Sequence, residues 1–446
     1  MGLKGVVVVL VVLSAVFGCR QSSHTEIQLN LGAKYGRSEV GIDVGDSTYH
    51  VVVDSMGKGR VVLAESCVAG YAGLLYARGW LSLYVEPGKN FEVILQEGVF
   101  SFRGEGAAKN DYLNSSFFRD FRYEYDKGEE EFCQFLNGRL CTCYRHLDSL
   151  GFDADFVSIE RQRLYYDVFL GLAYYPTKHV SDLSDADFHL TGDYADSLLL
   201  KMKENEELMG MSEYSYFFRR MIETYCRLIN SPVDDLQALD CQLSYVDRCI
   251  QGKKLAAFLT DRYMSEYMGN HGVDGLEDVL PFYDRKVTDS VTIQKFKTLY
   301  AQWARVAKGQ LSPDFCYTDI HGNQVSLADL QGKYVYIDLW ATWCYFCCRE
   351  IPDLKRLEQN LKGRNIYFVS ISCDQDTLAW KNKVEQEKLG GIQLICGDDR
   401  TFRDIYQVSG IPRFILIDPD GKIVSANMPR PSDPQTEKML RRLPGI

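Results

Sequence analysis

The spacing of the apolar residues changes twice along this 446-residue chain, and this change constrains the fold more than any other feature. In residues 25–106, short runs of alternating apolar and polar residues are separated by glycine and proline. Short strands at regular spacing are typical of a β-sandwich or barrel. We therefore expect a β-rich, sandwich-like domain there. The chain is about three times as long as a typical domain, which favours several domains over one core.

The spacing becomes helical in residues 110–309, for example at Phe296, Leu299 and Trp303. Aromatic residues are frequent in this region, and at helical spacing we interpret them as core rather than as a ligand groove. Cys141 and Cys143 have no second pair of ligands at zinc spacing and would point to nearly opposite sides of a helix. We expect an α-helical middle region without a metal site.

Residues 310–446 form a third pattern, in which strands alternate with a helix. Strands are expected at residues 334–340, 366–372, 414–418 and 423–426. An amphipathic helix lies between the first two strands. This order predicts an α/β domain in residues 310–446, with a strand-helix-strand unit followed by a hairpin.

The composition excludes several classes of protein. Hydrophobic residues make up 46% of the chain and charged residues 25%, which is typical of a globular protein and not of a disordered or fibrous one. The formal net charge is −11, so the basic surface expected of a nucleic-acid binder is absent. We expect no nucleic-acid partner.

The N-terminus has the pattern of an export signal. Lys4 precedes an apolar run over residues 6–17, which is too short to span a bilayer but has the length of a signal-peptide core. Residues 16–19 resemble the lipobox of bacterial lipoproteins, although Phe17 is larger than the residue usual there. We expect a signal peptide over residues 1–18 and a lipid on Cys19. An uncleaved anchor or ordinary cleavage is the alternative, and each possibility places the remaining chain outside the cytoplasm.

Two cysteines carry the spacing of a redox pair. Cys344 and Cys347 follow the expected strand at residues 334–340 and begin the next helix. A thiol at a helix N-terminus is stabilised as the reactive thiolate by the dipole and by unpaired N–H groups. Cys347 lies one turn later on the same side, where it can attack a mixed disulfide at Cys344. The pattern predicts dithiol chemistry.

The segment around these cysteines resembles the active site of thioredoxin-fold proteins. Residues 340–347 read Trp-Ala-Thr-Trp-Cys-Tyr-Phe-Cys and are followed by Glu-Ile-Pro at 350–352. The whole is most similar to the TlpA/ResA-like membrane-anchored thiol-disulfide oxidoreductases. The resemblance extends over about residues 311–440 and includes the segments 313–315, 319–322, 327–333, 410–412 and 417–422.

The resemblance assigns roles to particular residues. Cys344 matches the attacking cysteine and Cys347 the resolving one, so a redox-active Cys344–Cys347 disulfide is implied and no separate cofactor. Asp338 matches the buried acid that takes the proton of the resolving thiol, and burial would raise the pKa of its carboxyl. A surface carboxylate, or one bonded to backbone, is the alternative for Asp338. Trp343, together with Ile411 and the expected cis-proline Pro412, is expected to contact an extended substrate.

Three positions need separate interpretation. Phe346 replaces the proline usual before the second cysteine, which leaves the direction of electron transfer open, with reduction favoured. Cys348 points about 100° away from Cys347 on a helix and is interpreted as a packed thiol. Cys373 follows the strand at residues 366–372, and a buried structural role is favoured over a place in the site.

The sequence therefore predicts a thiol-disulfide oxidoreductase of the bacterial cell envelope, anchored by lipid and facing the periplasm. Its expected partners are disulfide-containing or dithiol proteins and a membrane or envelope redox protein. A binding or scaffold lipoprotein with a secondary thioredoxin-like domain is one alternative. A thiol peroxidase is another, although Ile337 and Ala341 replace the proline and threonine of that family's motif.

Overall fold

The structure is a computed structural model that describes residues 24–446 except 46, 65, 77–78, 184–187 and 233. Its internal contacts divide the chain into two units, one ending at Ile229 and one beginning at Asn230. This division falls inside the helical region, and the boundaries expected from the sequence stay a prediction. The expected signal peptide and Cys19 lie outside the described residues. Within the described residues, no helix has the length and apolar character needed to cross a membrane.

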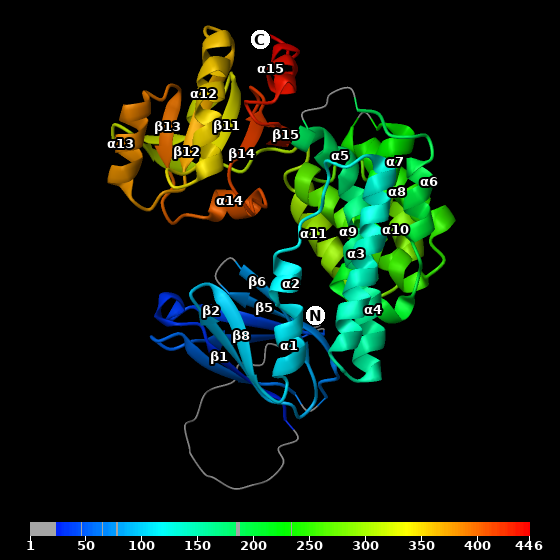
Figure 1. The fold of residues 1–446 in the computed structure, drawn as a ribbon. Coiled ribbons are helices and arrows are strands. Elements are labelled where there is room, and N and C mark those ends of the chain that lie inside the picture. The colour runs from blue at the N-terminus through cyan, green and yellow to red at the C-terminus, as the bar shows by residue number, and fades with distance from the viewer. Residues whose placement is uncertain (1–23, 46, 65, 77–78, 184–187, 233) are drawn as a thin grey trace. The chain divides into compact units, whose positions relative to one another are not determined.

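The first unit starts with two four-stranded sheets (Figure 1), ordered β4-β1-β7-β8 and β3-β2-β5-β6. Ile27 and Leu29 are buried on either side of the exposed Gln28, which is the period of two that the sequence predicts. Apolar side chains from both sheets form one cluster, as in a β-sandwich. The strands are β1 (Glu26–Asn30), β2 (Glu39–Val44), β3 (Ser47–Val52), β4 (Lys58–Val62), β5 (Gly70–Tyr76), β6 (Gly79–Val85), β7 (Phe91–Gln96) and β8 (Val99–Gly104).

Helices make up the rest of the first unit. Aromatic side chains fill their core: the rings of Phe132 and Tyr175 are stacked with centroids 4.6 Å apart, and Phe217 is fully buried. The aromatic density of the sequence therefore belongs to packing. The helices are α1 (Ala107–Leu113), α2 (Ser116–Arg119), α3 (Glu129–Ser149), α4 (Ala154–Phe169), α5 (Gly171–Leu183), α6 (Tyr194–Lys201) and α7 (Ser212–Asn230).

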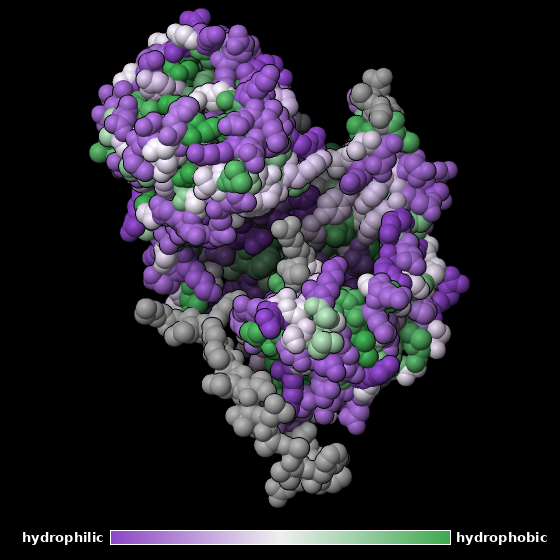
Figure 2. Space-filling view, turned by 90° about the vertical axis from the view of Figure 1, so that its left-hand side faces the viewer, coloured by the Kyte–Doolittle hydropathy of each residue, from purple (hydrophilic) through white to green (hydrophobic). Residues whose placement is uncertain are grey.

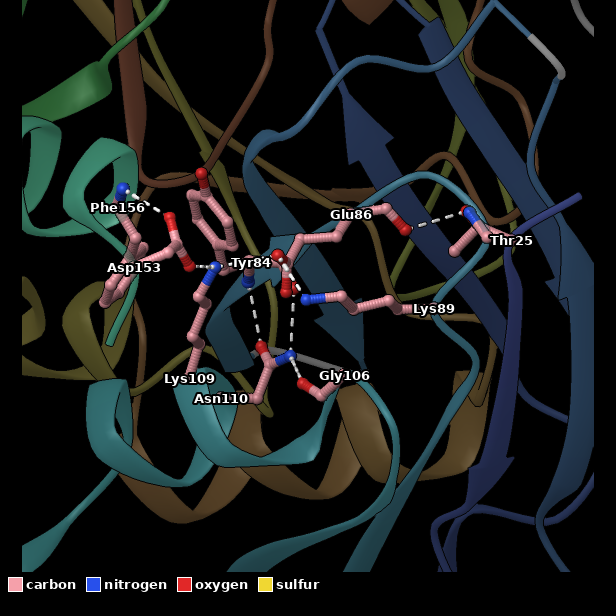
Figure 3. Close-up of polar contacts among 10 residues, drawn as sticks. Thr25, Tyr84, Glu86, Lys89, Gly106, Lys109, Asn110, Asp153 and Phe156 are labelled. Carbon is pink, nitrogen blue, oxygen red and sulfur yellow. Dashed lines mark hydrogen bonds and ion pairs between the residues drawn. The ribbon is translucent and has the colours of Figure 1, made fainter. Parts of the chain in front are cut away.

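Polar contacts join the β-sandwich to α1 and α4, as Figure 3 shows. The buried Nζ of Lys109 in α1 lies 2.7 Å from a carboxylate oxygen of Glu86 and 2.6 Å from one of Asp153, at the start of α4. The side chain of Asn110 accepts from the N–H of Tyr84 and donates to its carbonyl oxygen. Each buried polar group here has partners, which is the condition under which burial is tolerated.

In the residues that the structure describes, the second unit has four helices before the C-terminal domain. Two of them contact that domain directly: the Arg413 guanidinium lies 5.9 Å from the ring centroid of Trp303, and the side chain of Asn427 donates to the carbonyl oxygen of Asn270. The sequence pattern does not predict these contacts. The helices are α8 (Asp235–Cys249), α9 (Lys253–His271), α10 (Leu280–Lys286) and α11 (Ser290–Ala304).

The C-terminal domain is built on a seven-stranded sheet with the order β10-β9-β13-β12-β11-β14-β15. The strands β11, β12 and β13 are parallel, while β14 runs antiparallel to β11. The strands are β9 (Cys316–Asp319), β10 (Gln324–Ser326), β11 (Tyr334–Trp340), β12 (Ile366–Ser372), β13 (Ile392–Ile395), β14 (Arg413–Ile417) and β15 (Ile423–Met428). The helices are α12 (Tyr345–Asn360), α13 (Thr377–Glu387), α14 (Thr401–Ile405) and α15 (Pro434–Arg441).

This domain has the thioredoxin-like fold that the sequence predicts. The expected strands at residues 334–340 and 366–372 coincide with β11 and β12, and α12 connects them (Figure 1). Every residue of β11 is buried, as expected for a strand in the interior of a sheet. The multidomain fold class, with an N-terminal β-sandwich-like part and a helical middle, is confirmed.

Candidate active site

The connection from β11 to α12 places the two cysteines. Cys344 is the N-cap of α12, and Cys347 lies in the first turn. A disulfide joins them, with their Cα atoms 5.2 Å apart. The backbone N–H of Cys347 points at the Sγ of Cys344, at an N to S distance of 3.2 Å. Both cysteines are buried, with Cys344 7% exposed and Cys347 4% exposed.

The segment before β14 faces the pair. Because β14 pairs with β11, with Arg413 opposite Leu339, the preceding residues Ile411 and Pro412 lie beside the start of α12. The carbonyl oxygen of Ile411 lies 3.6 Å from the Sγ of Cys344. The Ile411–Pro412 peptide bond is cis. The structure thus brings Ile411 and Pro412, singled out from sequence, next to Cys344.

Exposed aromatic side chains flank the pair. Hydrophilic side chains cover most of the face drawn in Figure 2, with hydrophobic patches between them. Trp343, Tyr345 and Phe346 are 67%, 68% and 58% exposed. Three large apolar side chains next to Cys344 form a surface that could contact an apolar segment of another protein.

Asp338 lies on the sheet face that α12 covers. Side chains two apart on a strand share a face, so Asp338 is on the side of Tyr336 and Trp340. Tyr336 packs in one cluster with Leu354 of α12, and Trp340 packs in another with Cys347. The carboxyl is therefore buried between strand and helix, and the alternative of a surface carboxylate is wrong.

Burial raises the pKa of the Asp338 carboxyl to about 8, and the nearby Cys373, Glu350 and Glu358 add to this, while a hydrogen bond with Ser370 opposes it. Within the described part of the chain, Asp338 forms no ion pair. A carboxyl in such surroundings holds its proton near neutral pH and can exchange it there.

Two further acids near the pair have no role in the sequence interpretation. Asp374 is buried and accepts from the N–H and the hydroxyl of Thr342, at 3.0 and 2.7 Å, which holds the segment leading to Cys344. Glu350 in α12 accepts from the N–H and the hydroxyl of Ser432, both at 3.0 Å. The position of Asp374 just after β12 was a usable signal, because functional groups gather at the carboxyl ends of parallel strands.

Cys348 is half-buried outside the disulfide, and its Sγ lies 3.5 Å from the carbonyl oxygen of Thr342. It belongs to the apolar cluster that contains Trp340 and Cys347, which fits a packed thiol. In the residues that the structure describes, no three or more His, Cys, Asp or Glu side chains are grouped so that they could hold a metal ion.

Comparisons with known proteins address the same domain. The AhpC/TSA family matches residues 309–426. The thiol-disulfide oxidoreductase ResA of Bacillus thuringiensis (strain Al Hakam) is 28% identical over 159 residues, which is 35% of this chain and 90% of that protein. ResA of Bacillus thuringiensis subsp. konkukian (strain 97-27) is 30% identical over 135 residues, which is 30% of this chain and 78% of that protein. The chain belongs to the ResA-like thiol-disulfide oxidoreductases.

A solved structure of the thioredoxin domain of a thiol-disulfide oxidoreductase from Bacteroides vulgatus is 30% identical, and the match covers 30% of this chain and 96% of that chain, with a TM-score of 0.29. The AhpC/TSA match includes both Cys344 and Pro412. The similarity to the ResA relatives confirms the family expected from the sequence and its oxidoreductase activity. The individual roles of Cys344, Cys347, Asp338, Trp343, Ile411 and Pro412 stay predictions.

Proposed function

We propose that this protein is a cell-envelope thiol-disulfide oxidoreductase in which Cys344 attacks and Cys347 resolves. The observation that carries the proposal is the Cys344–Cys347 disulfide at the start of α12, with the Ile411 carbonyl oxygen 3.6 Å from the Sγ of Cys344. One sulfur lies at the helix N-terminus beside a backbone segment that an extended substrate can pair with. The pair itself is the redox group, and no separate cofactor is invoked.

In the reductive direction, the Cys344 thiolate attacks one sulfur of a substrate disulfide. The substrate disulfide breaks, a mixed disulfide forms, and one substrate thiolate leaves. The Cys347 thiolate then attacks the Sγ of Cys344, which releases the second substrate thiolate and forms the Cys344–Cys347 disulfide. The substrate gains two electrons and the protein pair loses two. A dithiol donor in the envelope restores them.

Asp338 is proposed to accept the proton of Cys347 in the resolving step. Its pKa of about 8, raised by burial, leaves a minor ionised fraction near neutral pH, and this ionised form is a stronger base than an ordinary carboxylate and accepts the thiol proton. Asp338 shares its sheet face with Trp340, which packs in one cluster with Cys347. The proton leaves a thiol and enters a carboxylate, so the charge between β11 and α12 stays constant during the transfer.

The proposed substrates are proteins with disulfides or dithiols in extended segments. Trp343 would contact apolar side chains of such a segment, because two thirds of its surface is free. The backbone of Ile411 and Pro412 would align the segment beside Cys344. We propose that reduction is the physiological direction. A potential near thioredoxin's, about −270 mV, fits that direction, whereas one near about −120 mV fits an oxidant.

Export and lipid attachment at Cys19 complete the proposal and place the enzyme on a membrane, facing the periplasm. They rest on the basic start, the apolar run over residues 6–17 and the Gly18–Cys19 pair. Mass spectrometry of the mature N-terminus tests this part. A diacylated or triacylated Cys19 is expected, and an unmodified peptide spanning Lys4 to Arg20 in the envelope fraction would contradict it.

The experiment on the chemistry compares three variants of the mature chain. Cys347→Ser should trap partners from an envelope extract as mixed disulfides that dithiothreitol releases, because Cys344 still attacks but nothing resolves the intermediate. Cys344→Ser should trap none. Cys348→Ser is the matched control, since it removes a neighbouring thiol outside the pair, and it should reduce insulin at the wild-type rate. Equal trapping by the Cys344→Ser and Cys347→Ser proteins would contradict the assignment.

The AhpC/TSA match makes a thiol peroxidase the second candidate. Ile337 and Ala341 are buried apolar residues at the positions where that family's motif has proline and threonine, so no hydroxyl at residue 341 can orient a peroxide. The reduced wild-type protein should consume hydrogen peroxide no faster than the Cys344→Ser variant. Peroxide consumption that depends on Cys344 and exceeds insulin reduction would favour the peroxidase.

A further inference from the structure

Cys373 and Cys396 lie at the ends of neighbouring strands in the C-terminal sheet. The parallel strands β12 and β13 pair Ser372 with Ile395, and the two cysteines are the next residues. The N–H of Cys396 donates to the carbonyl oxygen of Ser372 at 2.9 Å, so the ladder continues to them. Neighbouring strands lie about 4.8 Å apart and paired residues share a face. Disulfides join Cα atoms about 4.4 to 6.8 Å apart, which includes this spacing.

The accessibility of this pair matches that of the first pair. Cys373 is 7% exposed and Cys396 is 8% exposed, compared with 7% for Cys344. Both thiols are free in the structure. Cys373 is therefore as buried as Cys344, the cysteine proposed to attack. The charges around Cys373 decide whether its thiol can react.

These surroundings make the two thiols unequal. A hydrogen bond with Cys396 lowers the pKa of Cys373, and the Arg403 guanidinium in α14 lowers it further, against burial and the Asp374 carboxylate. The same hydrogen bond and burial raise the pKa of Cys396, and Asp399 adds to this while Arg403 opposes it. An acidic thiol beside a cation and a less acidic partner is the arrangement of an attacking and a resolving cysteine.

We propose that Cys373 and Cys396 form a second dithiol, which closes to a disulfide by exchange with a low-molecular-weight disulfide. The Cys373 thiolate attacks one sulfur of that disulfide and releases one small thiolate. Cys396 then attacks the Sγ of Cys373, the second small thiolate leaves with the proton of Cys396, and the protein pair has lost two electrons to the small disulfide. This step is independent of the proposed roles of Cys344 and Cys347.

The second pair adjoins the segment that carries the first. The N–H of Cys373 donates to the carbonyl oxygen of Trp340 at 2.8 Å, and Asp374, the next residue, accepts from Thr342, two residues before Cys344. A bond between Cys373 and Cys396 therefore forms at residues that directly support the start of the active-site segment.

The test uses the full mature chain and its Cys344→Ser/Cys347→Ser double variant, both first reduced. Each is equilibrated with glutathione buffers from fully reduced to fully oxidised, quenched with acid, alkylated and digested with trypsin, which leaves Cys373 and Cys396 in separate peptides. The expected result in both proteins is a cross-linked peptide pair that appears as the two thiols are lost together. Cys143, a buried thiol whose pKa burial raises to about 11, should stay free and serves as the internal control.

Single variants test the order of the steps. Cys396→Ser should accumulate one glutathione on Cys373, and Cys373→Ser should leave Cys396 unmodified. The proposal is overturned if both wild-type thiols stay free in buffers that fully oxidise Cys344 and Cys347, or if adducts form without a cross-link. The wild-type peptide map needs no substitution, so it decides the proposal even where a variant folds poorly. A cross-link in the double variant would stand even if the roles proposed for Cys344 and Cys347 failed.

Discussion

Two buried carboxyl groups, one in each unit, have opposite surroundings. Glu160 in α4 is fully buried and accepts two bonds from the Arg163 guanidinium, both at 2.7 Å, and one from the hydroxyl of Tyr112 at 2.9 Å. Asp338 in β11 has no cation partner among the described residues, and burial raises its pKa to about 8. The first arrangement compensates a buried charge, whereas the second leaves a carboxyl that can take up and release a proton near neutral pH.

The partners of the two carboxyls distinguish an acid that stabilises the fold from an acid that can take part in proton transfer. In a buried carboxylate that accepts two bonds from one arginine, the guanidinium compensates the buried charge. A buried carboxyl that lacks a cation and lies next to a reactive dithiol is the arrangement expected of a proton acceptor. Burial alone does not distinguish Glu160 from Asp338, but their hydrogen-bond and ion-pair partners do.

The largest effect is expected from removing the compensation in the first unit. Arg163→Met leaves Glu160 buried without its cation, which should lower the free energy of unfolding of that unit by about 3 to 5 kcal/mol. Urea denaturation and hydrogen exchange of α4 peptides measure it. Arg161→Met on the same helix is the control, because Arg161 pairs with Asp148 in an exposed ion pair and should cost less than about 1 kcal/mol. Equal losses of stability in Arg163→Met and Arg161→Met would show that the Arg163 guanidinium does not compensate the buried Glu160 charge.

Asp338→Asn tests the other side of the comparison. The amide cannot accept the proton of Cys347, so resolution of the mixed disulfide at pH 7 should slow by about 10²-fold, or about 2.7 kcal/mol of activation free energy. Stopped-flow reduction of a fluorescent disulfide substrate measures the step. Asp420→Asn, an exposed acid in the β14–β15 turn, should leave the rate unchanged. An unchanged rate for Asp338→Asn would mean that Asp338 takes no part in resolution.

The raised pKa of Asp338 also predicts how stability depends on pH. Because the folded-state pKa is about 8 and the unfolded value is 3.8, the folded state binds the extra proton between these values. The stability from this proton is complete below about pH 4 and is lost as the pH rises through 8, by up to about 1.4 kcal/mol per pH unit. Denaturation of the second unit at pH 5 to 8 should show this slope, and Asp338→Asn should flatten it. The same slope in both proteins would contradict the assignment.

The smallest effect is expected at Asp374. Asp374→Asn keeps the size of the side chain but removes the charge that strengthens the two bonds from Thr342, so a stability loss of about 1 kcal/mol is expected. In the same stopped-flow assay, Asp374→Asn should slow reduction of the substrate by less than Asp338→Asn does. A rate effect as large as that of Asp338→Asn would show that the segment before Cys344 matters as much as the proton acceptor.

The strands at the centre of the sheet and the dithiol can be predicted from the sequence because both depend on residues close together along the chain. The runs at 334–340 and 366–372 are continuous and apolar, as buried parallel strands are, and the spacing of Cys344 and Cys347 is local. The strand order is not local, so the sequence does not show that Cys396 lies beside Cys373. The partners of Glu160 are likewise invisible to periodicity, because Tyr112 lies 48 residues away.

The central claim is that Cys344, and not Cys347, is the attacking thiol, and the rate of alkylation of the reduced wild-type protein tests it most directly. Limiting iodoacetamide is added at pH 7, the reaction is quenched at intervals, and the two positions are resolved by fragmentation of the tryptic peptide that carries both. The account predicts that Cys344, at the N-terminus of α12, is modified about tenfold or more faster than Cys347. Equal rates, or faster modification of Cys347, would contradict it.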